Sequence, residues 1–146
     1  MNGVPVTILL IEDDPGHARL IEKNVRRAGV SNQIVHFMDG TSALKHIFGQ
    51  ESGTGSAAHA PLLVLLDLNL PDMTGLDILA RIKSDEHLKR TPVIVLTTTD
   101  DRLEIQKCYD LGCNVYITKP VDYEGFATAI RQLGLFLSVM QVPEPT

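Results

Sequence analysis

The chain has 146 residues, of which 44% are hydrophobic and 21% charged, a balance typical of a single soluble globular domain. Its formal net charge of −5 argues against a nucleic-acid-binding surface, which requires a basic face. No hydrophobic run approaches the roughly 20 residues of a membrane span, and the first residues lack the positive region of a signal peptide. We therefore expect a cytoplasmic protein that contacts neither nucleic acid nor membrane directly.

The cysteines and histidines predict no metal or redox site. Cys108 and Cys113 do not form a CxxC pair, and the five histidines do not cluster with them, so neither zinc nor thioredoxin-like chemistry is supported. We expect both thiols to be free and buried, as suits a reducing cytoplasm. None of the histidines is a candidate site residue.

The first predicted pair of elements is a strand over 6–11 and a helix whose first turn contains Pro15 and which continues over 17–27. The strand is a run of hydrophobic, mostly branched residues, and the helix carries apolar residues at helical spacing. Asp14 and Pro15 supply a helix cap and a first-turn proline. Gly29 is expected to end the helix.

A second strand is predicted over 33–37, and Asp39-Gly40 is interpreted only as the turn into a second helix. Residues 49–61 are small, polar and glycine-rich, which predicts a flexible surface loop, longer than most connections in α/β domains. The run 62–66 is apolar at every position, which is typical of a central strand in a parallel sheet.

The rest of the chain continues the alternation. The remaining helices are expected near 75–84, over 101–111 and from Asp122 onward, and the remaining strands over 92–97 and 114–118. Asp72 is interpreted as a loop and helix-entry residue, and Thr98 as an ordinary loop residue. Five strand–helix repeats predict an α/β fold with a doubly wound, five-stranded parallel sheet, right-handed crossovers and five flanking helices.

Five polar residues stand at or just past the ends of four predicted strands. They are Glu12, Asp13, Asp67, Thr97 and Lys119. In the strand order 2-1-3-4-5 the first and third strands are neighbours, and open α/β sheets bind their ligands beyond the carboxyl ends of the strands. We therefore expect these side chains to meet at one edge of the sheet.

The chemistry of this set points to a metal ion and a phosphoryl group. Three carboxylates within a few ångströms repel one another unless they are protonated or bridged by a cation. Mg²⁺ suits such a cluster because it prefers oxygen ligands. The site would keep Asp67 ionised and nucleophilic, and Lys119 and Thr97 would each reach an oxygen of an incoming phosphoryl group.

Four short motifs occur in order along the chain: IEDDP, LLDLNLPDMTG, VIVLTT and YITKP. Through them the chain resembles, over residues 6 to about 133, the receiver domain of two-component response regulators. The resemblance implies a flavodoxin-like fold with strand order 2-1-3-4-5 and phosphorylation of Asp67 by a sensor histidine kinase. It also implies a signalling protein that catalyses only its own phosphorylation and dephosphorylation, rather than an enzyme acting on other substrates.

The resemblance also assigns roles to the residues around the phosphoacceptor. It implies that Asp13 and Asp67 bind Mg²⁺ directly, that Glu12 holds a metal-bound water, and that Asn69 contributes its backbone carbonyl. Lys119 matches the lysine that the family uses to contact the phosphoryl group.

The expected response to phosphorylation is a switch between two arrangements. The family pattern implies that the hydroxyl of Thr97 moves to the phosphoryl oxygen and that Tyr116 follows it inward, whereas Asn69 and Thr99 tune the lifetime of the phosphate by controlling access of water. The new negative charge would favour one arrangement of the loop after the fourth strand. Partner binding would then change on the face made by the fourth helix, the fifth strand and the fifth helix.

A single receiver domain is predicted to span 1–146. No further domain is expected after it, so the protein should act by binding a partner. The segment 134–146 is an apolar extension and tail, and we expect a homodimer formed through it and the last helix. This segment and the loop 49–61 make the chain similar to stand-alone regulators paired with phytochrome-type histidine kinases.

The same residues disfavour three alternative functions. A receiver-like binding module without phosphorylation is disfavoured by the intact Asp13, Asp67, Thr97 and Lys119. A phosphatase of the haloacid-dehalogenase kind needs a second aspartate two residues after its nucleophile as general acid, where Asn69 stands. A mononucleotide-binding flavodoxin needs a neutral or positive phosphate loop after its first strand, where this chain has EDDPG.

Overall fold

The computed structural model describes residues 6–27, 29–49, 62–98 and 101–118, together with Glu124 and Thr128. These last two residues are helical, and the Thr128 hydroxyl donates to the Glu124 carbonyl at 2.9 Å, as in a helical turn. The remainder of the fifth helix expected from Asp122, the loop residues 50–61 and the extension 134–146 lie outside the described residues.

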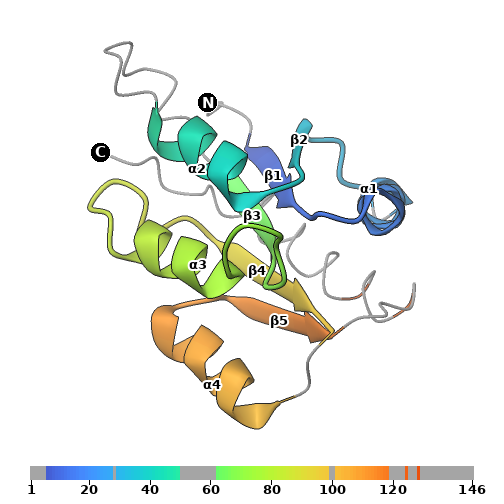
Figure 1. The fold of residues 1–146 in the computed structure, drawn as a ribbon. Helices are drawn as coiled ribbons and strands as arrows, with labels where there is room; N and C mark the ends of the chain where they lie inside the picture. The colour runs from blue at the N-terminus through green and yellow to red at the C-terminus, as the bar shows by residue number, and fades with distance from the viewer. Residues whose placement is uncertain are drawn as a thin grey trace.

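A parallel sheet of five strands forms the centre of the molecule (Figure 1). The strands are β1 (Thr7–Ile11), β2 (Ile34–Phe37), β3 (Leu62–Asp67), β4 (Val93–Thr97) and β5 (Val115–Thr118). All neighbouring pairs are parallel, and the order β2-β1-β3-β4-β5 confirms the predicted one. The two strands between β1 and β5 are buried along almost their whole length, as their continuous hydrophobic sequence requires.

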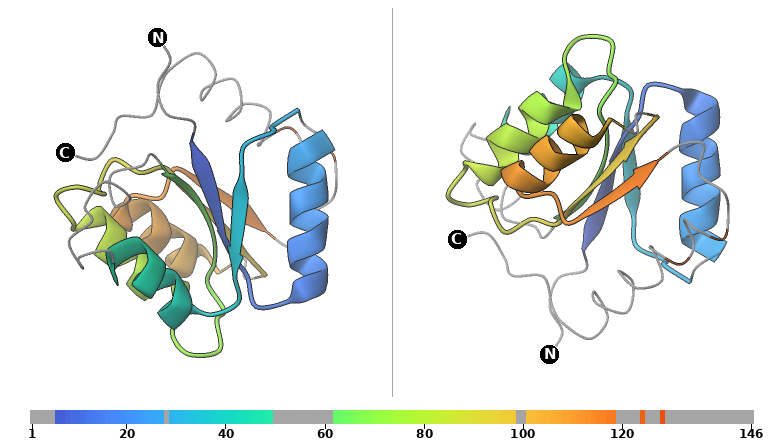
Figure 2. Two further views of the ribbon diagram at one scale, coloured as in Figure 1. Left: turned by 90° about the horizontal axis from the view of Figure 1, so that it is seen from above. Right: turned by 90° about the horizontal axis from the view of Figure 1, so that it is seen from below.

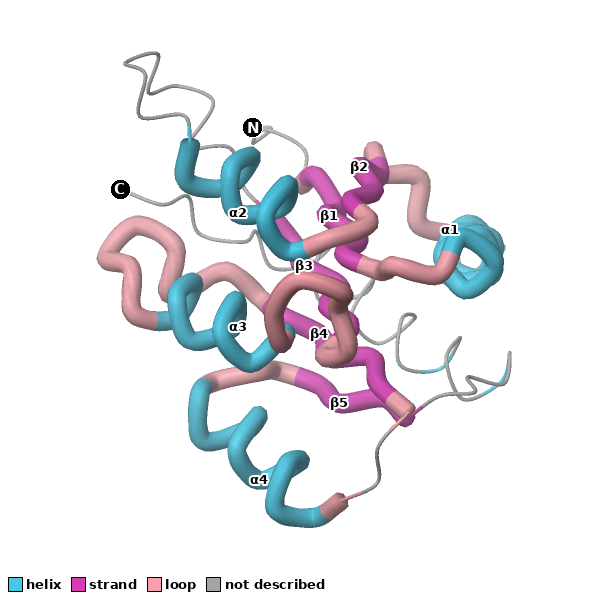
Figure 3. The backbone as a smooth tube through the Cα atoms, viewed as in Figure 1, coloured by secondary structure: helices cyan, strands magenta, loops and turns pink. Residues whose placement is uncertain are grey.

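Helices cover both faces of the sheet. They are α1 (Pro15–Arg27), α2 (Gly40–Phe48), α3 (Gly75–Lys83) and α4 (Arg102–Leu111). In the two views of Figure 2, α1 lies on one face, whereas α2, α3 and α4 lie on the other. The regular alternation of strand and helix along the tube (Figure 3) confirms the predicted flavodoxin-like fold class.

Polar side chains and glycines fix the helix ends. The Asp14 carboxylate accepts the His17 N–H at 3.0 Å, which confirms the predicted cap of α1. Asp39 does the same for α2, accepting the Ser42 N–H at 2.7 Å. The interpretation of that position as only a turn was therefore wrong, because the carboxylate caps the helix. Gly29 has a φ of +92°, which only glycine adopts easily, and it ends α1 as predicted.

Successive residues of the strands face two hydrophobic clusters, because side chains alternate between the faces of a sheet. In β3, Leu63 and Leu65 belong to the cluster beneath α1. Val64 and Leu66 belong to the larger cluster beneath α2, α3 and α4. This burial on both sides positions the residue that follows, Asp67, at the edge of the sheet.

The two cysteines belong to the end of α4. The Cys113 N–H donates to the Cys108 carbonyl at 3.0 Å, and Gly112 between them has a φ of +108°, which is the Schellman ending of a helix. Both thiols are free and buried, as predicted. Within the described residues, no helix is long and hydrophobic enough to cross a bilayer.

Candidate functional site

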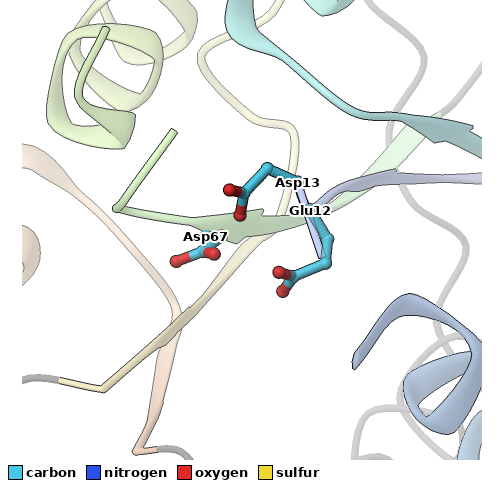
Figure 4. A group of neighbouring side chains, drawn as sticks. All are labelled: Glu12, Asp13 and Asp67. Carbon is cyan, nitrogen blue, oxygen red and sulfur yellow. The ribbon is translucent and has the colours of Figure 1, made fainter. Parts of the chain in front are cut away.

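Three carboxylates lie together beyond the carboxyl ends of β1 and β3 (Figure 4). Glu12 and Asp13 follow β1, Asp67 ends β3, and the two strands pair with Ile11 opposite Leu66. One carboxylate oxygen from each of the three acids lies within 4.8 Å of the other two. Glu12 and Asp67 are buried whereas Asp13 is exposed, so solvent reaches the cluster from the side of Asp13.

Backbone contacts hold Glu12 at the edge of the sheet. Its N–H donates to the Phe37 carbonyl at 3.0 Å, its Oε2 accepts the Asp14 N–H at 3.2 Å, and its carbonyl lies 2.7 Å from Nε2 of His36. His17, in the first turn of α1, brings Nδ1 to 3.8 Å from the same Oε2. Sequence reasoning missed this histidine because nothing in its spacing links it to the acids.

The loop between β3 and α3 holds Asp67. The Asn69 N–H donates to Asp67 Oδ1 at 3.0 Å, and the loop closes on itself through a bridge between Asn69 and Thr74 and a 2.9 Å bond from the Gly75 N–H to the Leu68 carbonyl. A Cβ at Gly75 would lie 2.5 Å from the Asp67 carbonyl oxygen. A glycine is therefore required where the loop returns past the carboxylate, a requirement that the sequence did not reveal.

Asp72, from the same loop, contacts the start of α2. Its Oδ1 accepts the Gly40 N–H at 2.9 Å, and its Oδ2 accepts the Thr41 N–H at 2.8 Å and the Thr41 hydroxyl. These bonds, of which that from the Thr41 hydroxyl has the largest effect, lower the pKa of Asp72 to about 2. The sequence predicted Asp72 to be a loop and helix-entry residue, but it could not indicate α2 as the partner, because Gly40 and Thr41 are 32 and 31 positions away.

Thr97 and Tyr116 lie on the same face of the sheet. Tyr116 is opposite Val95; Val95 belongs to the cluster beneath α2, α3 and α4, and Tyr116 packs against that cluster. Thr97 is two residues beyond Val95, so it has the same orientation, and it is fully buried. Next along the chain, the hydroxyl of Thr98 lies 3.5 Å from the side-chain nitrogen of Asn69, so the β3–α3 loop reaches the end of β4.

Lys119 and Thr99 lie outside the described residues. Of the five polar residues expected at the strand ends, the structure brings together Glu12, Asp13 and Asp67, and it places Thr97 at the end of the adjacent strand.

The three acids fit a hard divalent cation. An octahedral Mg²⁺ with ligands at about 2.1 Å separates opposite oxygens by about 4.2 Å. Oxygens within 4.8 Å of one another can therefore approach one such ion with small side-chain adjustments. All three donors are carboxylate oxygens, which Mg²⁺ and Mn²⁺ prefer to nitrogen or sulfur.

The sequence profile described as "Response regulator receiver domain" matches residues 8–131. The chain belongs to this family. Among curated relatives, response regulator Rcp1 of Synechocystis sp. is 37% identical over 115 residues, which are 79% of this chain and 77% of that protein. The receiver therefore accounts for most of the present chain.

Solved structures of receivers resemble the present fold closely. A response regulator receiver domain from Rhodospirillum rubrum has a TM-score of 0.82 and 68% identity, covering 96% of this chain and 99% of the other. The phosphorylated cyanobacterial phytochrome response regulator RcpA has a TM-score of 0.76 and 34% identity, covering 97% and 99%. The Mn²⁺-bound form of Rcp1 has a TM-score of 0.73 and 30% identity, covering 97% and 100%. Relatives of this receiver thus include one solved with a divalent metal and one solved in a phosphorylated state.

Proposed function

We propose that this receiver accepts a phosphoryl group on Asp67, in a Mg²⁺-dependent reaction, from a sensor histidine kinase. The observation that carries the proposal is the position of Asp67, a buried carboxylate at the end of β3 with two further acids within 4.8 Å. In the reaction an Asp67 oxygen bonds to phosphorus as the phosphorus–nitrogen bond of a phosphohistidine breaks. The existing structures of phosphorylated RcpA and Mn²⁺-bound Rcp1 support the same chemistry here.

The other residues of the site divide between metal binding and charge neutralisation. Asp13 and Asp67 would bind Mg²⁺ directly, Glu12 through a water molecule, and Asn69 through its backbone carbonyl. The bound ion supplies positive charge to the oxygens of the phosphoryl group. Lys119, which follows β5 in the sequence, would supply a second positive charge from another strand.

Phosphorylation would be transmitted through Thr97 and Tyr116. Their common orientation on the α2–α3–α4 face of the sheet allows a movement of the Thr97 hydroxyl toward the phosphoryl group to open space for the tyrosine ring. Asn69 and Thr99 would set the lifetime of the phosphate by controlling access of water. Partner binding would change on the face that includes α4 and β5.

The expected partners are a kinase and a second copy of the chain. Two of the similar structures are a phytochrome response regulator and a bacteriophytochrome response regulator, which supports a phytochrome-type histidine kinase as the phosphoryl donor in the cytoplasm. The homodimer would form through the extension 134–146, which lies outside the described residues. Charged replacements of Phe136 and Val139 should give a monomer by light scattering, and an unchanged mass would contradict this interface.

Acetyl phosphate, a small phosphoryl donor, tests the proposed reaction without the kinase. Incubation with acetyl phosphate and Mg²⁺ should add the mass of one phosphoryl group, and chelation of the metal should prevent the addition. The Asp67→Asn variant should show no gain, whereas Asp110→Asn, which changes an exposed acid of α4, should be phosphorylated like the wild type. Absence of the gain in the wild type would favour the alternative, a receiver-like module that binds partners without phosphorylation.

A further inference from the structure

The loop that carries the phosphoacceptor is tied to a helix from another part of the chain. Asp72 stands in the middle of this loop, and its two carboxylate oxygens accept three hydrogen bonds from Gly40 and Thr41. Met73, the next residue, packs so closely that a Cβ at Gly40 would lie 2.6 Å from its side chain. We call this contact between Asp72, Gly40 and Thr41 the loop clasp.

The loop clasp completes the amino-terminal cap of α2. The first amides of a helix have no acceptor within the helix. In α2 the amide of Ser42 is accepted by Asp39 from its own turn, whereas those of Gly40 and Thr41 are accepted by Asp72. A carboxylate is also favoured at this end of a helix by the helix dipole. The helix therefore provides a fixed and complementary anchor for the loop.

At its other end, next to the acidic cluster, the same loop is held by contacts of Asn69. Asn69 donates its N–H to Asp67 Oδ1 and forms the bridge to Thr74. The bond from the Gly75 N–H to the Leu68 carbonyl closes the base of this loop, so the contacts of Asp72 and those of Asn69 belong to one short, closed loop.

We infer that Asp72 is a positioning residue for the metal and phosphoacceptor site, which it keeps in its binding geometry by clasping the β3–α3 loop to α2. This role rests on the proposed function, because it concerns the backbone of Asn69 as a metal ligand. By thermodynamic linkage, if the clasp favours metal binding, metal binding must strengthen the clasp by the same factor. The start of α2 is then coupled to the occupancy of the site.

The affinity for Mg²⁺ measures the effect of the loop clasp on metal binding. In Asp72→Ala the dissociation constant for Mg²⁺, measured by calorimetry, should rise about fivefold, within the usual range of coupling between sites. Asp72→Asn keeps one carbonyl acceptor and should recover part of the affinity. Thr41→Val weakens the clasp from the other side, and combined with Asp72→Ala it should add little further loss. Asp110→Ala, the same change at an exposed acid of α4, should bind Mg²⁺ like the wild type.

Hydrogen exchange measures the reverse effect, that of Mg²⁺ binding on the loop clasp. Mg²⁺ should slow exchange of the Gly40 and Thr41 amides in the wild type by a factor similar to the change in affinity, and this effect should vanish in Asp72→Ala. A purely structural role would lower resistance to urea without changing either readout. Equal Mg²⁺ affinities in the wild type and Asp72→Ala would overturn the role of Asp72 alone. A wild-type protein that binds no Mg²⁺ would instead overturn the proposed function, and the role of Asp72 with it.

Discussion

The two ends of the sheet use polar residues in opposite ways. At the amino end two polar side chains satisfy backbone groups: Lys83 Nζ donates to the Thr91 carbonyl at 2.6 Å, and Asn114 Oδ1 accepts the Val93 N–H at 2.8 Å. At the carboxyl end three acids of the same charge are gathered within 4.8 Å. The polar residues at the amino end stabilise the fold, whereas the acids at the carboxyl end repel one another, and the proposed cation would relieve that repulsion.

The largest expected effect is at the carboxyl end, in Gly75→Ala. The new Cβ would lie 2.5 Å from the Asp67 carbonyl oxygen and 2.8 Å from Leu68 Cα, and backbone atoms cannot move aside as a side chain can. We expect a loss of about 3 kcal/mol in the free energy of unfolding, measured by urea denaturation. Gly16→Ala is the control, because its Cβ would meet only a side-chain oxygen of Asp14, at 3.2 Å. A stable Gly75→Ala protein would show that the loop can be displaced.

Addition of Mg²⁺ should offset the repulsion within the acidic cluster and so raise the free energy of unfolding. A ligand that binds only the folded state at about 100 times its dissociation constant raises the free energy of unfolding by about 2.7 kcal/mol. Thermal unfolding with Mg²⁺ and with a chelator measures this difference. In Asp13→Asn the stabilisation should be much smaller, while Asp77→Asn, on the exposed side of α3, should retain it. Equal stabilisation of all three proteins would place the ion elsewhere.

At the amino end, the buried thiol of Cys113 should make the free energy of unfolding depend on pH in the alkaline range. Burial raises the pKa of this thiol to about 11, so the folded state keeps a proton that the unfolded chain releases above about pH 8.5. The resulting stability is present below pH 8.5 and is lost as the pH rises toward 11. The burial of Lys83, which lowers the pKa of that ammonium, acts in the opposite direction. Urea unfolding at several pH values should therefore show a shallower alkaline loss in Cys113→Ala, and identical slopes would contradict the assignment.

The smallest effect is expected for Lys83→Met. The methionine keeps the apolar stem but removes the bonds to the carbonyls of Thr91 and Lys89, which should lower the free energy of unfolding by about 1 kcal/mol. Mg²⁺ affinity should be unchanged, because this lysine lies at the other end of the sheet. Lys89→Met, which removes an exposed ion pair with Glu86, should cost less than about 0.5 kcal/mol. A changed Mg²⁺ affinity in Lys83→Met would show that residues at the amino end of the sheet do affect metal binding at the carboxyl end.

Most of the fold could be predicted because each strand has a recognisable hydrophobic pattern in its own short segment of sequence. The run preceding Asp67 is apolar without interruption, and the run preceding Glu12 is interrupted only by Thr7. Such runs separated by amphipathic helices favour a parallel sheet with helices on both sides. The strand order followed from the family resemblance and is confirmed. The start of α1 at Pro15 also agrees with the predicted cap and first-turn proline, because proline occupies the first helical position without losing a hydrogen bond.

The candidate site was predictable in part for the same reason. Parallel strands deliver the residues that follow them to one edge, so the proximity of Glu12, Asp13 and Asp67 needs only the strand order. The role of Asp39 as a cap was missed, because the same aspartate–glycine sequence also suits a simple turn. The approach of His17 to Glu12 depends on how α1 leaves the sheet, which no local pattern specifies.

The sequence by itself determined the identity and order of the elements, and with them the set of acids at the edge of the sheet, because hydrophobic periodicity and strand direction are properties of short segments. Only the tertiary structure decided that Asp72 clasps α2 and that Gly75 must pass beside Asp67. Both depend on the packing of loops against elements distant in the chain, and such packing follows from the shape of the whole core.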